Sequence, residues 1–430
     1  VSEVHPDAEV RDACADLLNE TVAFRMERDS DPALFAAIEA TEVPDDADGA
    51  RARELSLLDF RLQGAHLDAD TRARLTELNA QISEATTAFS QNIRDNVGRI
   101  TVRPEALDGL PADYVEAHPL DADGLATITT DYPDLVPFLD MSRDREARRA
   151  LVEADYGRAY PANDEVLSRL LQLRDEKARL LGYPDFPDYA VAQMMMPSGD
   201  QIGAFIDDVN RAARPAGLAD RERLLARLRE DHPDATELTA ADNRYYIELL
   251  KSELFGVDPH EVRRYVDFTK VRDGILALTG RLFGVSYVPV DAPAWHADVE
   301  AYDVVEDGER LGRIFLDMHP REGKYGHMAC FPLVDGLRDR HLPEAALVCN
   351  FPRGLMTFDD LLTFLHEFGH LVHAIFSGRV THARLAGLSE QGEWDFVEAP
   401  SQLLEEWGWT HEVLRDFATD ADEPVPRVVD

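Results

Sequence analysis

Apolar residues that recur at three- and four-residue steps predict that most of this chain is helical. Residues 71–96 are typical of a long amphipathic helix in a bundle, and residues 146–181 form a second helical run. The apolar positions of the first segment are Leu75, Leu78, Ile82, Ala85, Phe89 and Ile93. A proline-rich stretch at residues 103–139 breaks the regularity between the two runs. We therefore expect a helical N-terminal domain at residues 1–150 and a second domain at residues 151–430.

Between residues 299 and 351 the spacing of apolar residues changes from the helical three to four residues to the two-residue alternation of strands. Residues 299–305 and 311–318 flank the turn signal Glu306-Asp307-Gly308, which predicts a β-hairpin. Residues 327–333 and 346–351 read as further short strands. The predicted fold is therefore mainly α, with a small β-sheet directly before the next helical segment.

That next helix, at residues 358–375, contains the sequence HEFGH. Thr357 or Asp359 can cap its start. Its broad apolar stripe comprises Phe358, Leu361, Leu362, Leu365, Phe368, Leu371, Val372 and Ile375. His366 and His370 are four residues apart, so they share one helix face, where two imidazoles can bind one Zn²⁺. Glu367 beside them is placed to act as a general base. The alternative is two histidines satisfied in a core helix with an incidental acid between them.

A third zinc ligand is expected downstream, in the apolar-periodic segment WDFVEAPSQLLEEW. We predict Glu398, because two histidines and one glutamate leave a fourth position open for water, as catalytic zinc sites do. Gln402 or Glu405 can orient one of the zinc ligands by hydrogen-bonding to it. Alternatively, Glu405 and Glu406 form a solvated face.

The composition excludes some classes of binding partner and favours one cellular compartment. The 83 acidic residues exceed the 44 basic ones and give a net charge of −39, which opposes binding to nucleic acid and to anionic membranes. Acids alternate with arginines along predicted helices, whereas an acidic interaction protein would concentrate them in runs. Cys14, Cys330 and Cys349 form no CxxC pair, and no apolar run approaches 18 residues. These features favour a reduced cytoplasm.

Three segments carry a resemblance to a known family: HEFGHLVH, DFVEAPSQLLEEW and LDMHPREGKYGHMACFPL. Together they resemble the thimet oligopeptidase and oligopeptidase A family of zinc metallopeptidases. The resemblance implies one zinc ion on His366, His370 and Glu398, Glu367 as the general base, and a helical fold with a channel for short peptides. It also implies a monomer. The predicted function is a zinc-dependent metalloendopeptidase acting on short peptides.

The chain departs from the resembled pattern at both ends. It begins at Val1, and it stops at Asp430, before the segment in which the family has a glycine-rich loop, a histidine and several tyrosines that bind substrate. The resemblance thus implies a fragment whose catalytic domain is incomplete at its C-terminus. Because losing one oxyanion donor costs about 10²–10³ in rate, we expect residues 1–430 alone to cleave peptides at least about a hundredfold more slowly than a longer chain.

Two other functions stay open at this point. A peptidyl-dipeptidase could use the same zinc site if a residue captured the substrate's terminal carboxylate. A zinc-binding scaffold or inactive fragment would hold the metal without catalysis. For the enzyme, residues 326–331 are the expected edge strand that pairs with the substrate backbone. Lys324, Tyr325 and His327 are expected at the rim, unless Tyr325 and His327 only pack or face solvent.

Overall fold

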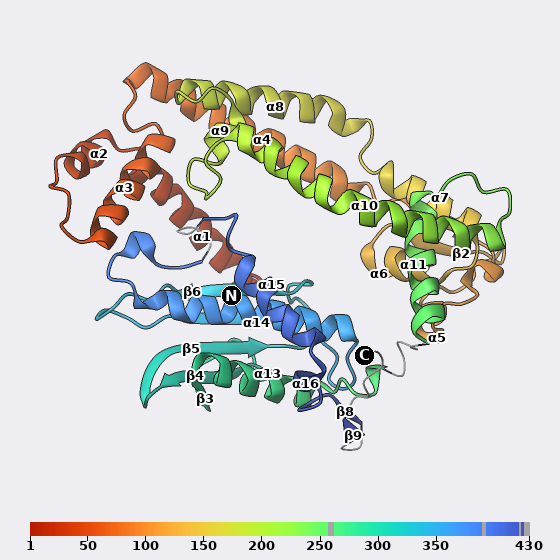
Figure 1. Cartoon of the computed structure of the whole chain (residues 1–430). Coiled ribbons are helices and arrows are strands. Elements are labelled where there is room, and N and C mark those ends of the chain that lie inside the picture. The colour runs from red at the N-terminus through yellow and green to blue at the C-terminus, as the bar shows by residue number, and fades with distance from the viewer. Residues whose placement is uncertain (257–261, 389–392, 421–422, 425–430) are drawn as a thin grey trace. The chain divides into compact units, whose positions relative to one another are not determined.

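The computed structural model describes residues 1–256, 262–388, 393–420 and 423–424 (Figure 1). The chain divides into two compact units. The first combines Val1–Arg72, Ala190–Pro197 and Asp258–Asp430, and the second combines Ala73–Tyr189 and Ser198–Val257. The division of the chain into domains at residue 150 stays a prediction.

The second unit is mainly helical. Its helices are α4 (Ala69–Asp95, which begins in the first unit), α5 (Ala112–Ala117), α6 (Tyr132–Met141), α7 (Arg145–Tyr156), α8 (Ala162–Leu180), α9 (Phe186–Ala190), α10 (Gly199–Asp231) and α11 (Ala240–Phe255). The predicted amphipathic helix at residues 71–96 is confirmed as α4, whereas the second helical run is interrupted between α7 and α8. The proline-rich stretch contains a 3₁₀ turn (Pro104–Leu107), α5, α6 and strand β2 (Ala126–Thr129), which pairs with β1 (Arg99–Val102).

A buried ion pair joins α7 to α11 within this unit. The Asp242 side chain is fully buried and accepts hydrogen bonds from Nε and Nη2 of Arg145 at 2.6 and 2.7 Å. Arg148, also buried, donates to the backbone oxygen of Ala241 at 2.9 Å. Burial by itself raises the pKa of Asp242, but the hydrogen bonds from Arg145 and Thr239 outweigh it, so the pKa lies below its ordinary value.

The first unit contains a five-stranded sheet with the order β3-β4-β5-β7-β6. The strands are β3 (Ser286–Pro289), β4 (Glu300–Glu306), β5 (Glu309–Asp317), β6 (Ala329–Val334) and β7 (Glu344–Val348). The predicted hairpin is confirmed as β4 and β5, and both Asp307 and Gly308 have the positive φ that a tight two-residue turn requires. β5 pairs with β7 in parallel, and all other pairs are antiparallel. This arrangement leaves β6 at one edge of the sheet.

Helices α13 (Phe268–Phe283) and α14 (Phe358–Phe376) share one apolar core with the sheet. The core positions of α14 include Leu361, Phe364, Leu365, Phe368 and Leu371, all fully buried. The opposite face of the sheet has a smaller cluster of Ala301, Phe315 and Ala346, against which Trp295 packs. Alternate residues of one strand thus enter different layers. The mainly helical fold with a small sheet beside the HEFGH helix is confirmed.

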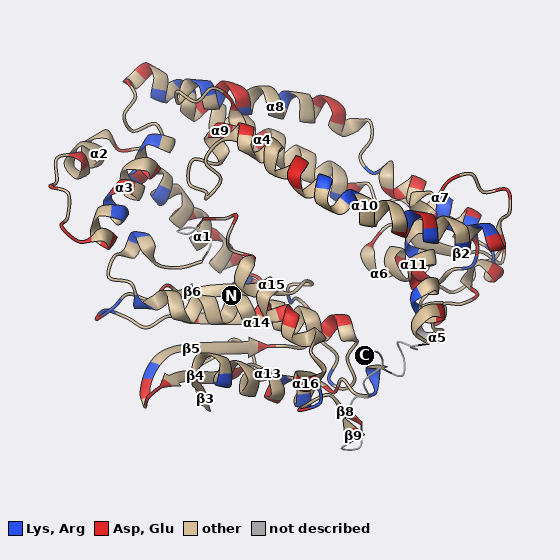
Figure 2. Ribbon diagram, in the orientation of Figure 1, with Lys and Arg blue, Asp and Glu red and all other residues tan. Residues whose placement is uncertain are grey.

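The remaining elements of the first unit come from both ends of the chain. They are α1 (Ala8–Asp29), α2 (Pro32–Glu39), α3 (Ala47–Leu62), α15 (Ala399–Glu405), α16 (His411–Leu414), the 3₁₀ turns Ser377–Arg379, Ala383–Leu385 and Glu406–Trp409, and the strand pair β8 (Thr419–Asp420) and β9 (Glu423–Pro424). Figure 2 shows basic residues interspersed with acidic ones along the same helices. Within the described ranges, no helix has the length and apolar character needed to cross a membrane.

Candidate metal centre

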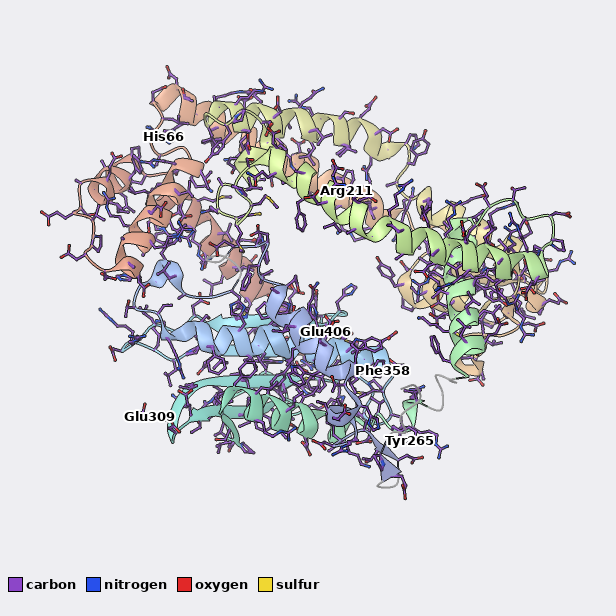
Figure 3. All side chains as sticks on the ribbon, viewed as in Figure 1. His66, Arg211, Tyr265, Glu309, Phe358 and Glu406 are labelled. Carbon is purple, nitrogen blue, oxygen red and sulfur yellow. The ribbon has the colours of Figure 1, made fainter. Side chains whose placement is uncertain are left out.

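Helix α14 presents the two histidines of HEFGH on one face. Its start is fixed by Thr357, whose side chain accepts the Asp360 N–H at 3.0 Å, while the Asp360 carboxylate accepts the Thr357 N–H at 2.8 Å. This reciprocal capping box confirms Thr357 as the cap. Figure 3 labels Phe358, the first residue of the helix. The buried apolar stripe fixes the rotation of the helix, and His366 and His370 lie side by side, one turn apart.

Glu398 reaches the histidines from the start of the neighbouring helix α15. The sequence indicated a helix that contains Glu398, but α15 begins at Ala399 and Glu398 is the residue before it. Pro400 in the first turn accounts for the start, since proline lacks the N–H that an earlier helical turn would need. The two helices approach closely at Gly369. A Cβ there would lie 2.6 Å from Ser401 Cα and 3.0 Å from the Pro400 oxygen.

Three ligand atoms converge between these helices. Glu398 Oε2 lies 3.2 Å from His366 Nε2 and 3.1 Å from His370 Nε2, and the two nitrogens are 3.2 Å apart. Two ligands that each lie about 2.0–2.1 Å from a tetrahedral zinc ion are separated by about 3.3 Å. Of the His, Cys, Asp and Glu side chains in the described part of the chain, these three form the group able to hold a metal ion. Their spacing therefore fits zinc.

Further contacts fix the orientation of the three side chains. Nδ1 of His366 lies 2.5 Å from Glu405 Oε1, and Ser401, fully buried, places its Oγ 2.9 Å from Glu398 Oε2. With the Nδ1 proton donated to Glu405, Nε2 of His366 carries a lone pair that faces the Glu398 carboxylate. Two acceptors at this distance repel each other unless a cation lies between them. Of the two residues expected to orient a ligand, Glu405 makes the contact, whereas Gln402 is exposed.

Glu367 lies beside the centre and is buried, with 8% of its surface exposed. Burial raises the pKa of Glu367 above its ordinary value, and the nearby Glu398 carboxylate adds to this rise. The electrostatic effect of His366 and a hydrogen bond from the Cys330 backbone N–H oppose it. Cys330 belongs to edge strand β6, so Glu367 lies between the metal centre and the sheet edge. Burial lowers the pKa of His370, which favours the neutral imidazole that a metal requires.

The loop before β6 differs from its prediction at one residue. Lys324 was expected at a rim, but its ammonium group is fully buried and contacts Asp317 Oδ1 at 2.9 Å. It also donates to the backbone oxygens of Asp317, His319 and Cys349. This lysine is therefore a structural residue. Tyr325 packs its ring edge against Phe331, and His327 is exposed.

Sequence reasoning missed Gly369, Ser401 and the Cys330 backbone. A glycine between the two histidines and a serine three residues after Glu398 were visible, but nothing in their spacing showed that α14 and α15 meet there.

The fold and the site define a mainly helical protein whose H-E-x-x-H motif and Glu398 have the spacing to hold a metal ion. A model of Peptidase family M3 matches residues 138–427, more than half of the chain, and the chain belongs to that family. Members of this family are in general zinc-dependent metallopeptidases.

Individual relatives agree with this placement. Thimet-like oligopeptidase of Dictyostelium discoideum is 31% identical over 379 residues, which cover 83% of this chain and 56% of that protein. Oligopeptidase A of Escherichia coli is 29% identical over 406 residues, or 88% of this chain and 59% of the relative. A solved structure assigned as an oligoendopeptidase F from Bacillus anthracis has a TM-score of 0.50 at 15% identity and covers 98% of this chain and 63% of that one. The chain thus spans little more than half the length of these curated relatives.

Proposed function

We propose that this chain carries the zinc centre of an oligopeptidase that hydrolyses short peptides. The observation that supports this most is the triangle of His366, His370 and Glu398 ligand atoms, with sides of 3.1–3.2 Å, next to the buried Glu367 carboxylate. Two histidines and one glutamate are one of the ligand sets that catalytic zinc sites use.

When bound, the zinc ion would supply a Lewis acid that makes a water molecule more acidic and polarises the scissile carbonyl. Glu367 is proposed as the general base. Its carboxylate would take a proton from the attacking water and pass it to the leaving amine. A raised pKa favours the first transfer, because a more basic carboxylate takes up the proton of the water more readily. Glu405 keeps the His366 ring in one orientation through Nδ1.

Strand β6 is proposed to bind the substrate backbone. It pairs with β7 on one side only, so its other edge offers N–H and C=O groups to an extended peptide. Such pairing recognises peptides without requiring a particular sequence. The structure has the edge strand at Ala329–Val334, slightly later than the predicted residues 326–331. A cytoplasmic, monomeric enzyme with short peptides as substrates completes the proposal, in agreement with the free thiols of Cys14, Cys330 and Cys349.

Zinc stoichiometry, measured together with cleavage of quenched fluorescent peptides, tests this function. We expect about one zinc per chain, and loss of most of it in His366→Ala, His370→Ala and Glu398→Ala. Glu367→Gln is the matched variant, since the amide leaves the ligands in place but cannot accept the proton. It should keep zinc, and in the complete enzyme it should lose turnover. Analysis of the products separates an endopeptidase from a peptidyl-dipeptidase, and zinc binding without any cleavage would leave the scaffold or the inactive fragment.

A further inference from the structure

Strand β6 lies at one edge of the five-stranded sheet, so one side of its backbone pairs with β7 and the other side is open. In a strand, the N–H and C=O groups of one residue point to the same side, and those of the next residue point to the other side. The backbone groups on the open side of β6 can therefore be identified from the bonds that β7 makes.

β7 pairs with β5 on its other side, and two hydrogen bonds there set the alternation. The Cys349 N–H donates to the Asp317 oxygen at 2.8 Å, and the Arg313 N–H donates to the Pro343 oxygen at 3.0 Å. Asp317 and Arg313 belong to β5. Because Pro343 and Cys349 directly flank β7, the odd-numbered residues of β7 face β5 and its even-numbered residues face β6.

This alternation fixes the direction of each residue in the first part of β6. Ala329 and Phe331 lie opposite even-numbered residues of β7, so their backbone groups point toward β7. Cys330 and Pro332 lie opposite odd-numbered residues, so their backbone groups point to the open side. The Cys330 N–H agrees with this assignment, because it donates to the Glu367 carboxylate of α14, which is not part of the sheet.

Between Ala329 and Pro332, the open side of β6 offers acceptors but no free donor. The Cys330 N–H is already bonded to Glu367, and proline has no N–H. The carbonyl oxygens of Cys330 and Pro332 are thus the groups that this stretch of the edge presents to a ligand. An ordinary strand edge presents both donors and acceptors.

An edge of this kind does not pair with itself. Open strand edges associate through complementary N–H and C=O groups, and proline is one of the residues that prevent such association. If two copies of β6 met at this stretch, each would present carbonyl oxygens to the other, and no hydrogen bond could form. The edge therefore stays available for a ligand that brings its own donors.

We propose that β6 recognises a peptide through two of the peptide's backbone N–H groups, which donate to the Cys330 and Pro332 oxygens. Because these oxygens belong to residues two apart in an extended strand, the two N–H groups must also come from peptide residues two apart. Proline or another N-substituted residue at either position removes the donor, and no bond in the reverse direction compensates for the loss.

This inference rests on the proposed peptidase function and deepens it. Recognition through the backbone accepts most side chains, but it excludes proline from two positions of the substrate. Pro332 is the residue that determines this specificity, since any other residue there would supply an N–H to a peptide carbonyl.

Backbone-modified peptides test the proposal on the unaltered protein. Calorimetric titrations of the zinc-loaded chain of 430 residues would compare one blocked hexapeptide with six forms, each N-methylated at a single residue. Methylation at two positions, two residues apart, should weaken binding about twofold to tenfold each, because one net hydrogen bond contributes about that factor. Methylation elsewhere should be tolerated. Ester replacements remove the same N–H groups without adding a methyl group, and they should identify the same two positions.

Pro332→Ala should have the opposite effect. The alanine N–H points to the open side and can donate to a carbonyl of the peptide, so the unmodified hexapeptide should bind about twofold to tenfold more tightly. Pro289→Ala is the matched control, because Pro289 lies on β3, the strand at the opposite edge of the same sheet. The affinity of the control for the hexapeptide should equal that of the parent.

Several results would refute the proposal. They are the absence of peptide binding, tolerance of N-methylation at every position, equal weakening at all six, or equal affinities of Pro332→Ala and Pro289→Ala for the hexapeptide. The proposed function fails in a different way. A chain that shows the two-position pattern but binds no zinc would refute the peptidase and keep the recognition by β6, whereas a zinc-dependent peptidase without the pattern would refute only the recognition.

Discussion

Replacing Gly369 by alanine has two opposite effects on stability, one from helix propensity and one from packing. Alanine in a helix interior is favoured over glycine by about 0.5–1 kcal/mol, so propensity alone predicts a more stable protein. Packing predicts the reverse. The new Cβ would lie 2.6 Å from Ser401 Cα and 3.0 Å from the Pro400 oxygen, and both neighbours are backbone atoms that no side-chain rotation can remove.

The packing effect should prevail. Ordinary contacts of a Cβ are about 3.4–4 Å, so α15 must move away from α14 by about 1 Å, and overpacking of this kind costs about 1–3 kcal/mol. Glu398 moves with α15. Metal–ligand distances tolerate only about 0.2 Å, so the shift should weaken zinc binding by at least about tenfold.

Two measurements decide the outcome for Gly369→Ala. A competition titration against a chromophoric chelator gives the zinc affinity, and chemical unfolding of the zinc-free protein gives the stability. Gly203→Ala is the matched control, because this glycine also lies within a helix, α10, and its added Cβ meets no atom within 4 Å. The control should be slightly more stable than the parent. Our reasoning is wrong if Gly369→Ala binds zinc as the parent does and unfolds no more easily.

Three further predictions concern the residue that orients His366, the dependence of stability on pH and its dependence on salt. Glu405→Ala should weaken zinc binding about 10–100-fold, Glu405→Gln less so, and the exposed neighbour Glu406→Ala not at all. Asp242→Asn should cost about 3 kcal/mol at pH 7, measured by chemical unfolding, because it leaves Arg145 without its partner. The pKa of Asp242 is lower in the folded protein than the unfolded value of about 3.8, so its contribution to stability is complete above pH 3.8 and is lost as the pH falls through the folded-state pKa. The difference in stability between the parent and Asp242→Asn should therefore become smaller in acid. Raising salt from 0.1 to 1 M shortens the screening length from about 10 to about 3 Å and should raise the melting temperature more than in a near-neutral helical protein.

Each of these has a result that contradicts it. Equal zinc affinities for Glu405→Ala and Glu406→Ala would remove the orienting role of Glu405. A constant difference between parent and Asp242→Asn down to pH 2 would show that this carboxylate does not titrate as described. A melting temperature that is flat or falls with salt would show that repulsion among the acids is unimportant.

Local sequence patterns predicted those parts of the fold that depend on neighbouring residues. The apolar stripe and Thr357 located α14, and the Asp307-Gly308 step located the β4–β5 turn, because helix caps and tight turns use residues a few positions apart. The four-residue spacing likewise placed His366 and His370 together.

Such local patterns could not predict contacts between segments that are distant in the sequence. Nothing in the order of strands along the chain showed that β7 would pair in parallel with β5 and leave β6 outside. Lys324 was misplaced for a similar reason: one of the oxygens that enclose it, that of Cys349, comes from 25 positions further on, and a lysine is usually exposed. The contact of Ser401 with Glu398 depends on how closely α15 approaches Gly369, which only the packed structure reveals.

The division of the first unit among three stretches of chain has a consequence for biosynthesis. Residues Val1–Arg72 leave the ribosome well before the rest of their unit, because the sheet and α14 begin only after Asp258. At about 5–20 residues per second, the 186 residues from Arg72 to Asp258 take roughly 10–40 s to translate. The second unit is nearly continuous in sequence and can fold during that interval. The apolar cluster of Phe35, Leu57 and Phe60 lies within Val1–Arg72 and can form early. Asp59 on α3, by contrast, gains its partners Gln193 and Arg384 only after those residues have been made, so this attachment of α3 to the rest of its unit forms late.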